Sequence, residues 1–190
     1  VSVVVGQRQV FEVEAMDRYD NIWTPNNPLW QVRDENGQHG DTDNPTQSGA
    51  AGIIDDQGTL RAGTVASTLL SEVKVTYQGQ STFADLYLVP DEPANVTIDP
   101  VDREVFPNQI FSFSARVSDQ YDNDINNVEA IFEALPTAGF ITESGIFTAT
   151  DRVGYYPDAI RATVSEGVFD TTNITIINSD PARIDIDPVS

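Results

Sequence analysis

An internal repeat constrains this chain more than any other feature of its sequence. Residues 113–123 hold an alternating apolar segment followed by Asp119-Gln120-Tyr121-Asp122-Asn123. Residues 11–21 have the same pattern and end in Asp17-Arg18-Tyr19-Asp20-Asn21. A chain of 190 residues that repeats one strand and turn at about half its length is typical of two tandem copies of a small β domain.

The two copies differ by one insertion. After the turns, residues 52–62 and 139–149 share the pattern Gly-x-Ile-x-x-x-Gly-x-φ-x-Ala, where φ is apolar. The spacing between the copies is smaller here than at the turns, so the first copy carries additional residues in between. They fall in the polar stretch 33–49, which is predicted to be an inserted loop and a candidate binding surface. The single histidine, His39, is interpreted as a solvated residue of this loop.

A second repeat sets the boundaries. Residues 93–100, Pro-Ala-Asn-Val-Thr-Ile-Asp-Pro, recur at 181–188 as Pro-Ala-Arg-Ile-Asp-Ile-Asp-Pro. The predicted domains are therefore 1–92, which lacks its opening strand, and 93–180. Residues 181–190 are the opening strand of a following repeat or a strand exchanged with a neighbour, with Ala182, Ile184 and Ile186 as the exchanged side chains.

Each domain is close to the ~100 residues of an immunoglobulin-like sandwich. The predicted fold is all-β, with two tandem immunoglobulin-like β-sandwich domains in an elongated arrangement. Residues 7–15 are expected to form one alternating strand. The aromatic residues Phe11, Trp30, Phe113 and Phe132 are expected in the cores, because they recur at equivalent places, whereas Trp23 lies beside a turn and is expected to be partly exposed.

The strand-turn motif, the following aromatic strand and the Gly-x-Ile-x-x-x-Gly pattern together resemble the tandem immunoglobulin-like repeats of prokaryotic surface adhesins of the invasin/intimin type. The resemblance implies an extracellular or cell-surface location and repeats that project a terminal domain from the cell. One departure is that Asp20 and Asp122 stand where the usual turn has glycine.

The composition excludes several classes of function. The chain has 30 acidic and 10 basic residues and a formal net charge of -20, so it is expected to bind no nucleic acid. No apolar run approaches the ~20 residues of a membrane span, which excludes membrane insertion by a helix. There is no cysteine, and with one histidine and no nucleophile motif the chain is expected not to be an enzyme.

Two kinds of site are predicted in the strands and turns. Asp17, Asp20, Asp119, Asp122 and Asp124 gather oxygen ligands of the kind that Ca²⁺ prefers, so calcium is the one candidate cofactor. The alternative is a turn in which the Asp side chain bonds its own backbone. Asn95 and Asn173 each begin an Asn-x-Thr triplet, the acceptor pattern of N-glycosylation.

The predicted function is structural or adhesive: an extracellular repeat segment of a stalk, adhesin or filament. One form of this function is assembly by strand complementation through residues 181–190. The expected partners are other copies of the chain or neighbouring immunoglobulin-like repeats, and a host or matrix protein or a glycan. Two alternatives stay open: a ligand-binding module that uses the 33–49 loop, and a non-catalytic accessory segment of a secreted hydrolase.

Overall fold

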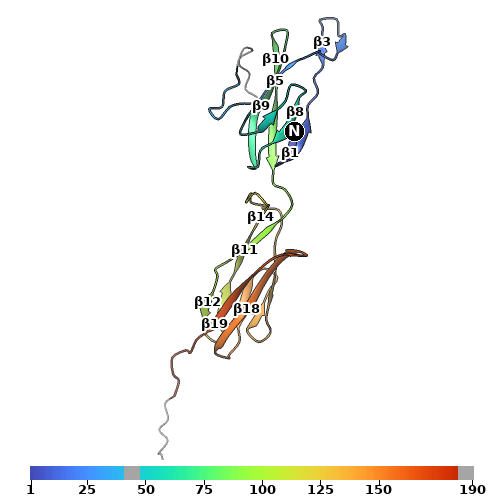
Figure 1. The fold of residues 1–190 in the computed structure, drawn as a ribbon. Helices are drawn as coiled ribbons and strands as arrows, with labels where there is room; N and C mark the ends of the chain where they lie inside the picture. Colours follow the sequence, from blue (N-terminus) through green and yellow to red (C-terminus); the bar gives the residue numbers. More distant parts are fainter. Residues whose placement is uncertain (41–47, 184–190) are drawn as a thin grey trace, which may run out of the picture. The chain divides into compact units, whose positions relative to one another are not determined.

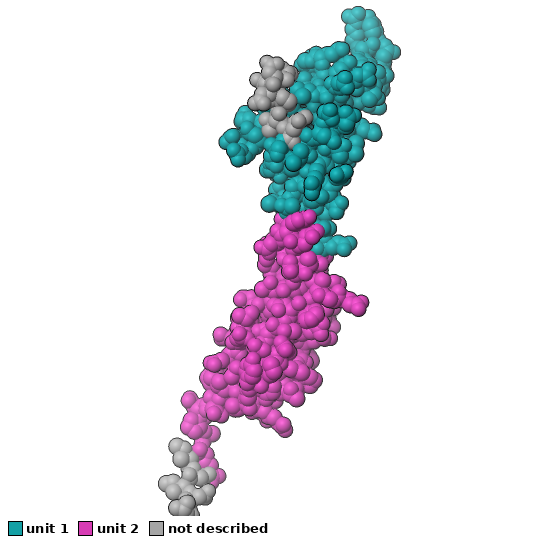
Figure 2. Space-filling model, viewed as in Figure 1, with its two compact units in different colours: residues 1–92 teal, residues 93–190 magenta. Residues whose placement is uncertain are grey.

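The structure, a computed structural model, describes residues 1–40 and 48–183, and it confirms the all-β fold. The chain divides into two compact units, Val1–Glu92 and Pro93–Ser190 (Figures 1 and 2). Across the described residues, no helix has the length and apolar character needed to cross a membrane.

The described residues of the first unit form two four-stranded sheets and a short ribbon. One sheet has the order β1-β10-β9-β5, with β1 (Ser2–Val4), β10 (Gln80–Val89), β9 (Ser67–Tyr77) and β5 (Leu29–Gln31). The other has the order β2-β8-β7-β6, with β2 (Arg8–Val10), β8 (Thr59–Ala62), β7 (Gly52–Ile54) and β6 (Ser48–Gly49). The ribbon pairs β3 (Ala15–Met16) with β4 (Ile22–Trp23).

The second unit has a closely related set of strands. Its four-stranded sheet has the order β12-β19-β18-β15, with β12 (Arg103–Val105), β19 (Val168–Ile176), β18 (Gly154–Ser165) and β15 (Ile131–Ala134). A three-stranded sheet joins β13 (Ile110–Ser112), β17 (Ile146–Ala149) and β16 (Gly139–Ile141). A further pair joins β11 (Asn95–Asp99) and β14 (Ser114–Ser118).

The sequence repeat is also a repeat of sheet topology. In the first unit β1 runs parallel to β10, with Val3 opposite Leu88. In the second unit β12 runs parallel to β19, with Val105 opposite Ile176. The other pairings among the described strands are antiparallel. The same strand order therefore follows from the same alternation of apolar residues in both units.

Each unit has its own apolar core between its sheets. Trp30 is 5% exposed and Phe132 is 6% exposed, and each belongs to the core cluster of its unit. Phe113 is also buried, and Phe11 is half-buried against Trp30. Trp30, Phe113 and Phe132 confirm the predicted core aromatics, whereas Phe11 packs against the core without being part of it. Trp23, at 41% exposed, confirms the predicted partial exposure. Burial of each such side chain stabilises its unit by about 1.5–3 kcal/mol.

The glycine turns between the short strands bring backbone against the core aromatic. Gly58 has φ +77°, and a Cβ there would lie 2.7 Å from a ring atom of Trp30. Gly145, at φ +89°, is the equivalent glycine, and a Cβ there would lie 2.4 Å from the backbone oxygen of Phe113 and 3.2 Å from a ring atom of Phe132. Only glycine combines a left-handed backbone with this close approach.

The predicted single strand over residues 7–15 is wrong, because the first unit interrupts it between β2 and β3. The equivalent segment of the second unit, residues 109–117, is interrupted only at Phe113, between β13 and β14, and β14 pairs along its whole length with β11. Among the described residues no strand lies along the corresponding edge of the first unit. An extended segment without a partner makes no ladder of hydrogen bonds, so residues 11–14 are not in a strand.

Candidate functional site

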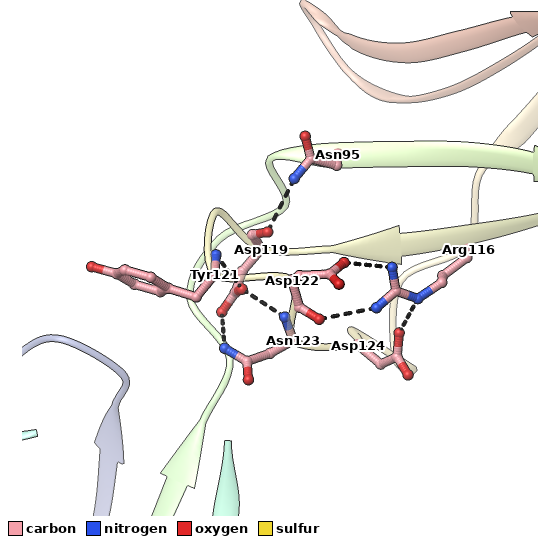
Figure 3. Close-up of polar contacts among 7 residues, drawn as sticks. All are labelled: Asn95, Arg116, Asp119, Tyr121, Asp122, Asn123 and Asp124. Atoms are coloured by element: carbon pink, nitrogen blue, oxygen red, sulfur yellow. Dashed lines mark hydrogen bonds and ion pairs between the residues drawn. The ribbon is translucent and has the colours of Figure 1, made fainter. Parts of the chain in front are cut away.

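The repeated turns are closed by their own aspartates. In the second unit, Asp119 Oδ1 accepts hydrogen bonds from the backbone N–H groups of Tyr121 (2.8 Å) and Asn123 (2.9 Å), and its Oδ2 accepts from Asn123 Nδ2 at 2.9 Å (Figure 3). In the first unit, Asp17 accepts the same three bonds from Tyr19 and Asn21, at 2.8 to 3.0 Å. The bonds from Asn21 and Tyr19 hold the pKa of Asp17 below its usual value, because they favour the carboxylate.

Asp20 and Asp122, which replace the usual glycine of these turns, adopt an unusual backbone conformation. Asp20 has φ 65° and Asp122 has φ 66°, so both adopt the left-handed conformation that glycine adopts without strain. Aspartate is among the few other residues that tolerate this conformation. The turn therefore keeps its geometry and gains an exposed carboxylate in each copy.

In the second unit this carboxylate is paired with a guanidinium. Arg116 Nη1 lies 2.6 Å from Asp122 Oδ1, Nη2 donates to the backbone oxygen of Asp122 at 2.9 Å, and Nε contacts Asp124 Oδ1 (Figure 3). The bonds to Asp122 and Asp124 raise the pKa of Arg116. The sequence reasoning missed this pairing, although the hairpin places Arg116 across from the turn. At the equivalent position the first unit has Glu14.

Four of the five predicted calcium ligands, all except Asp20, are therefore engaged with protein partners. Both oxygens of Asp17 and Asp119 accept bonds within their turns, and Asp122 and Asp124 share Arg116. Over residues 1–40 and 48–183 no group of three or more metal-binding side chains converges. Calcium binding stays a prediction that needs a measurement.

The two turns differ most in burial. Asp119 is 0% exposed, and Asn95, at the start of β11, donates from Nδ2 to its backbone oxygen at 3.1 Å. Asp17 is only half-buried. Met16 is 62% exposed, whereas Ser118, at the equivalent position, is 3% exposed. The difference arises because β11 covers the turn and its strand in the second unit.

The first unit has a groove where β11 would lie. One part, of about 290 Å³, is lined by residues that include Val13, Met16, Trp23 and Thr82. An adjoining part, of about 200 Å³, is lined on one side by residues 11–14 and on the other by β9 and β10. In the second unit the equivalent space holds β11, which contacts β18 and β19. The groove is one candidate ligand site of the first unit.

The strands beneath these positions carry different side chains. In the second unit, Asp170 Oδ2 accepts from the backbone N–H of Ile98 at 2.9 Å, and Thr172 Oγ1 accepts from Asp102 N at 2.8 Å. The equivalent residues of β10 are Thr82 and Ala84, which are more exposed than their counterparts. The floor of the groove therefore lacks the carboxylate that holds β11 in place.

The base of the 33–49 loop is fastened to β9. Glu72 is buried, and its Oε1 accepts from Arg33 N at 3.1 Å, while its backbone oxygen accepts from His39 Nε2 at 2.8 Å. Burial raises the pKa of Glu72. In the second unit, Leu135 N donates instead to the backbone oxygen of Ala159 at 2.8 Å. The carboxylate of Glu72 thus accepts the hydrogen bond from the backbone N–H of Arg33, at the point where the inserted loop begins.

This loop base corrects the interpretation of His39 as a solvated residue. His39 is half-buried, and its ring packs against Phe83 with centroids 5.6 Å apart. The sequence reasoning also missed Glu72; its signal is the alignment with Ala159, which puts a carboxylate at a core position. Residues 41–47 of the predicted binding loop lie outside the described residues.

The remaining predicted sites fall on strands or at the chain end. Asn95 opens β11, and Asn173 lies in β19, where its Nδ2 donates to Asp102 Oδ1 at 2.7 Å and its Oδ1 accepts from Asp158 N at 2.9 Å. A glycan on Asn173 would replace one of the two hydrogens of the nitrogen that donates to Asp102, and glycosylation stays a prediction. Ala182 is exposed, and Ile184 and Ile186 lie outside the described residues.

Comparison with known proteins gives distant structural likenesses only. No family model matches the chain, and no curated protein matches its sequence. A crystal structure of the S-layer protein SbsC covers 88% of this chain at 14% identity with a TM-score of 0.42, and a structure of its domains 1–6 covers 88% at 14% with 0.40. This chain covers 23% of each of those two chains. Domains 4 and 5 of SbsC match 87% of this chain and 80% of theirs, at 14% identity and a TM-score of 0.39. At these scores the likeness is too distant to assign a shared function.

Proposed function

We propose that this chain is a non-catalytic structural segment of an extracellular surface protein, in which β-sandwich units are repeated as a stalk, adhesin or filament. The observation that carries the proposal is the repeated sheet topology: both units place a short parallel strand, β1 or β12, beside their last long strand. Units of one design can be added in series without a new fold. The net charge of -20 favours a soluble surface.

The finer form of the proposal is assembly by strand complementation. The first unit has a groove at the place that β11 fills in the second unit. Residues 181–188 have the same apolar pattern as residues 93–100. A strand of this kind supplied by a preceding repeat of one chain would complete a stalk. The same strand supplied by another copy would build a filament, because the contact is head to tail.

Deletion of residues 181–190 tests the filament form. The intact chain is expected to form oligomers or fibres, measured by light scattering after size exclusion and by electron microscopy, and the shortened chain is expected to stay monomeric. A monomeric intact chain, or equal assembly without residues 181–190, would leave only the stalk form of the proposal.

The alternatives are tested by binding. Arrays of glycans and of host and matrix proteins should give no specific signal with a structural segment. A specific ligand whose binding is lost when residues 41–47 are replaced by a short glycine-serine linker would favour the ligand-binding module instead.

A further inference from the structure

We propose that each unit carries a docking groove for an extended peptide segment of a partner protein, and that this segment bears a lysine or arginine side chain. In the second unit the groove, called the side groove below, lies between β14 and the segment that leads to β15, and its walls include Ala115, Glu129 and Glu143. A partner of this kind goes beyond the proposed structural function and does not depend on assembly of the chain into a filament.

One edge of β14 is paired along its whole length, and the other is paired only in part. β11 pairs along the first edge. On the second edge, the backbone oxygen of Val117 accepts from Ile125 N at 2.9 Å. Two residues beyond Ala115, Phe113 N donates to the backbone oxygen of Gly145 at 2.8 Å. Because alternate residues of a strand direct their N–H and C=O groups to the same edge, those of Ala115 also point to this edge. In the described part of the chain, no backbone group pairs with them there.

The side groove of the second unit opens at this gap. It has a volume of about 530 Å³, and its walls include the half-buried side chains of Val128 and Ala130 and the core rings of Phe113 and Phe132. β11 is in place on the opposite edge of β14, so this groove is not the space of an absent strand. A backbone donor, a backbone acceptor and apolar walls are the features that bind an added peptide strand.

The first unit has the same groove. Its backbone is paired at Phe11, which donates from N to the backbone oxygen of Gly58 at 2.9 Å, and again at Ala15 in the β3–β4 ribbon. Val13, the equivalent of Ala115, lies between these two contacts, and no described backbone group pairs with it. The groove beside it also measures about 530 Å³ and has largely equivalent walls. The gap is therefore a feature of the shared fold.

The walls of both grooves favour a cation. In the second unit Glu129 and Glu143 are exposed on the walls, and the positive charge of Arg116 is already paired with two carboxylates. The described walls of the first groove have exposed acidic residues and no basic one: Glu12, Glu14 and Asp56. The alkyl stem of lysine or arginine can cover the apolar surface while its charged head reaches the carboxylates. The charges thus select the partner, and the backbone bonds and apolar contacts hold it.

An NMR titration of the intact, isotope-labelled chain tests the proposal. The probe is a short peptide of alternating threonine and valine with one central lysine, blocked at both ends. We expect saturable shifts of the backbone amide signals of Ala115 and Val13, because each N–H gains an acceptor. Binding should weaken roughly threefold between about 0.05 M and about 0.5 M NaCl, because salt screens exposed charges.

Matched peptides separate the backbone contribution from the charge. A peptide methylated on its backbone nitrogens keeps the lysine but loses its N–H donors, and it should not bind. A peptide with glutamate in place of lysine should bind roughly fivefold more weakly or less.

Matched variants of the second unit use the first unit as an internal reference. Glu129→Gln with Glu143→Gln should weaken binding to the second groove roughly threefold and leave binding to the first groove unchanged. Glu104→Gln with Glu133→Gln removes the same charge from exposed positions outside the groove and should leave both affinities unchanged.

The outcomes do not depend on whether the chain assembles. Absence of shifts at both Ala115 and Val13 at the highest peptide concentration overturns the proposal, even for a chain that forms filaments. Equal binding of the lysine and glutamate peptides, or equal effects of the two pairs of glutamate variants, overturns the basic partner. Shifts spread over the acidic surface, without saturation at these two amides, indicate general attraction to a chain of net charge -20 and also overturn it. Saturable shifts at both amides that require the lysine and the peptide N–H groups support the side groove, whether the chain is monomeric or assembled.

Discussion

The equivalent aspartates of the two turns allow one interaction to be tested in two surroundings. Replacement of Asp119 by alanine removes three hydrogen bonds to a carboxylate that is 0% exposed. Hydrogen bonds to charged groups contribute about 1.5–3 kcal/mol each. Bonds within one turn are not additive, however, and other residues of this turn are exposed to water. We expect Asp119→Ala to lower the free energy of unfolding of the second unit by about 3 kcal/mol.

The tryptophans make the assay specific for each unit. Both Trp23 and Trp30 lie in the first unit, so their emission follows that unit, whereas far-UV circular dichroism follows both. A loss of about 3 kcal/mol corresponds to a fall in melting temperature of roughly 12–24 °C for a domain of this size. The dichroism transition of the Asp119→Ala variant should therefore begin far below its tryptophan transition.

Asp17→Ala is the control in the first unit. Asp17 makes the same three bonds, but no β11 covers it and water can replace the lost acceptor. Its loss should lower the tryptophan transition by less than Asp119→Ala lowers the transition of the second unit. An equal or larger effect at Asp17 would refute the argument that the opening strand makes the turn important for stability.

Three further predictions concern the first unit and the turns. Burial raises the pKa of Glu72 above 4.5, so the stability that this side chain contributes is present below about pH 4.5 and is lost as the pH rises through its folded-state pKa. Glu72→Gln should therefore raise the urea midpoint of the tryptophan transition at pH 7 and have little effect in acid. A lower midpoint at pH 7 would contradict this. Gly58→Ala should lower the free energy of unfolding by about 3 kcal/mol or more, because the new Cβ clashes with Trp30. Gly79→Ala, at φ +80° with open space around it, should lower it by only about 1 kcal/mol. Equal losses would show that backbone strain alone matters. If calcium binds the turns, the melting temperature should be higher in calcium than in chelator. The double variant Asp20→Ala with Asp122→Ala should abolish this difference. Equal melting temperatures of the wild-type protein in calcium and in chelator would reject the calcium hypothesis.

Local pattern and repetition were enough to predict the all-β fold, the short strands around the glycine turns and the core places of Trp30 and Phe132. These features depend on residues that are close in sequence or that recur at equivalent positions. The left-handed backbone of Asp20 and Asp122 also follows from the turn chemistry of the motif.

Only the tertiary structure decided which segments found partners. The motif at residues 11–21 and its copy at 113–123 share one pattern of residues, yet one is an interrupted, half-buried segment and the other contains a continuous strand that leads into a buried turn. The cause lies outside the motif, in the presence of β11 beside one copy. The roles of Glu72 and His39 were likewise decided by residues more than 30 positions away. A strand needs a neighbour to satisfy its backbone, and burial depends on what covers it, so neither can be read from a segment alone.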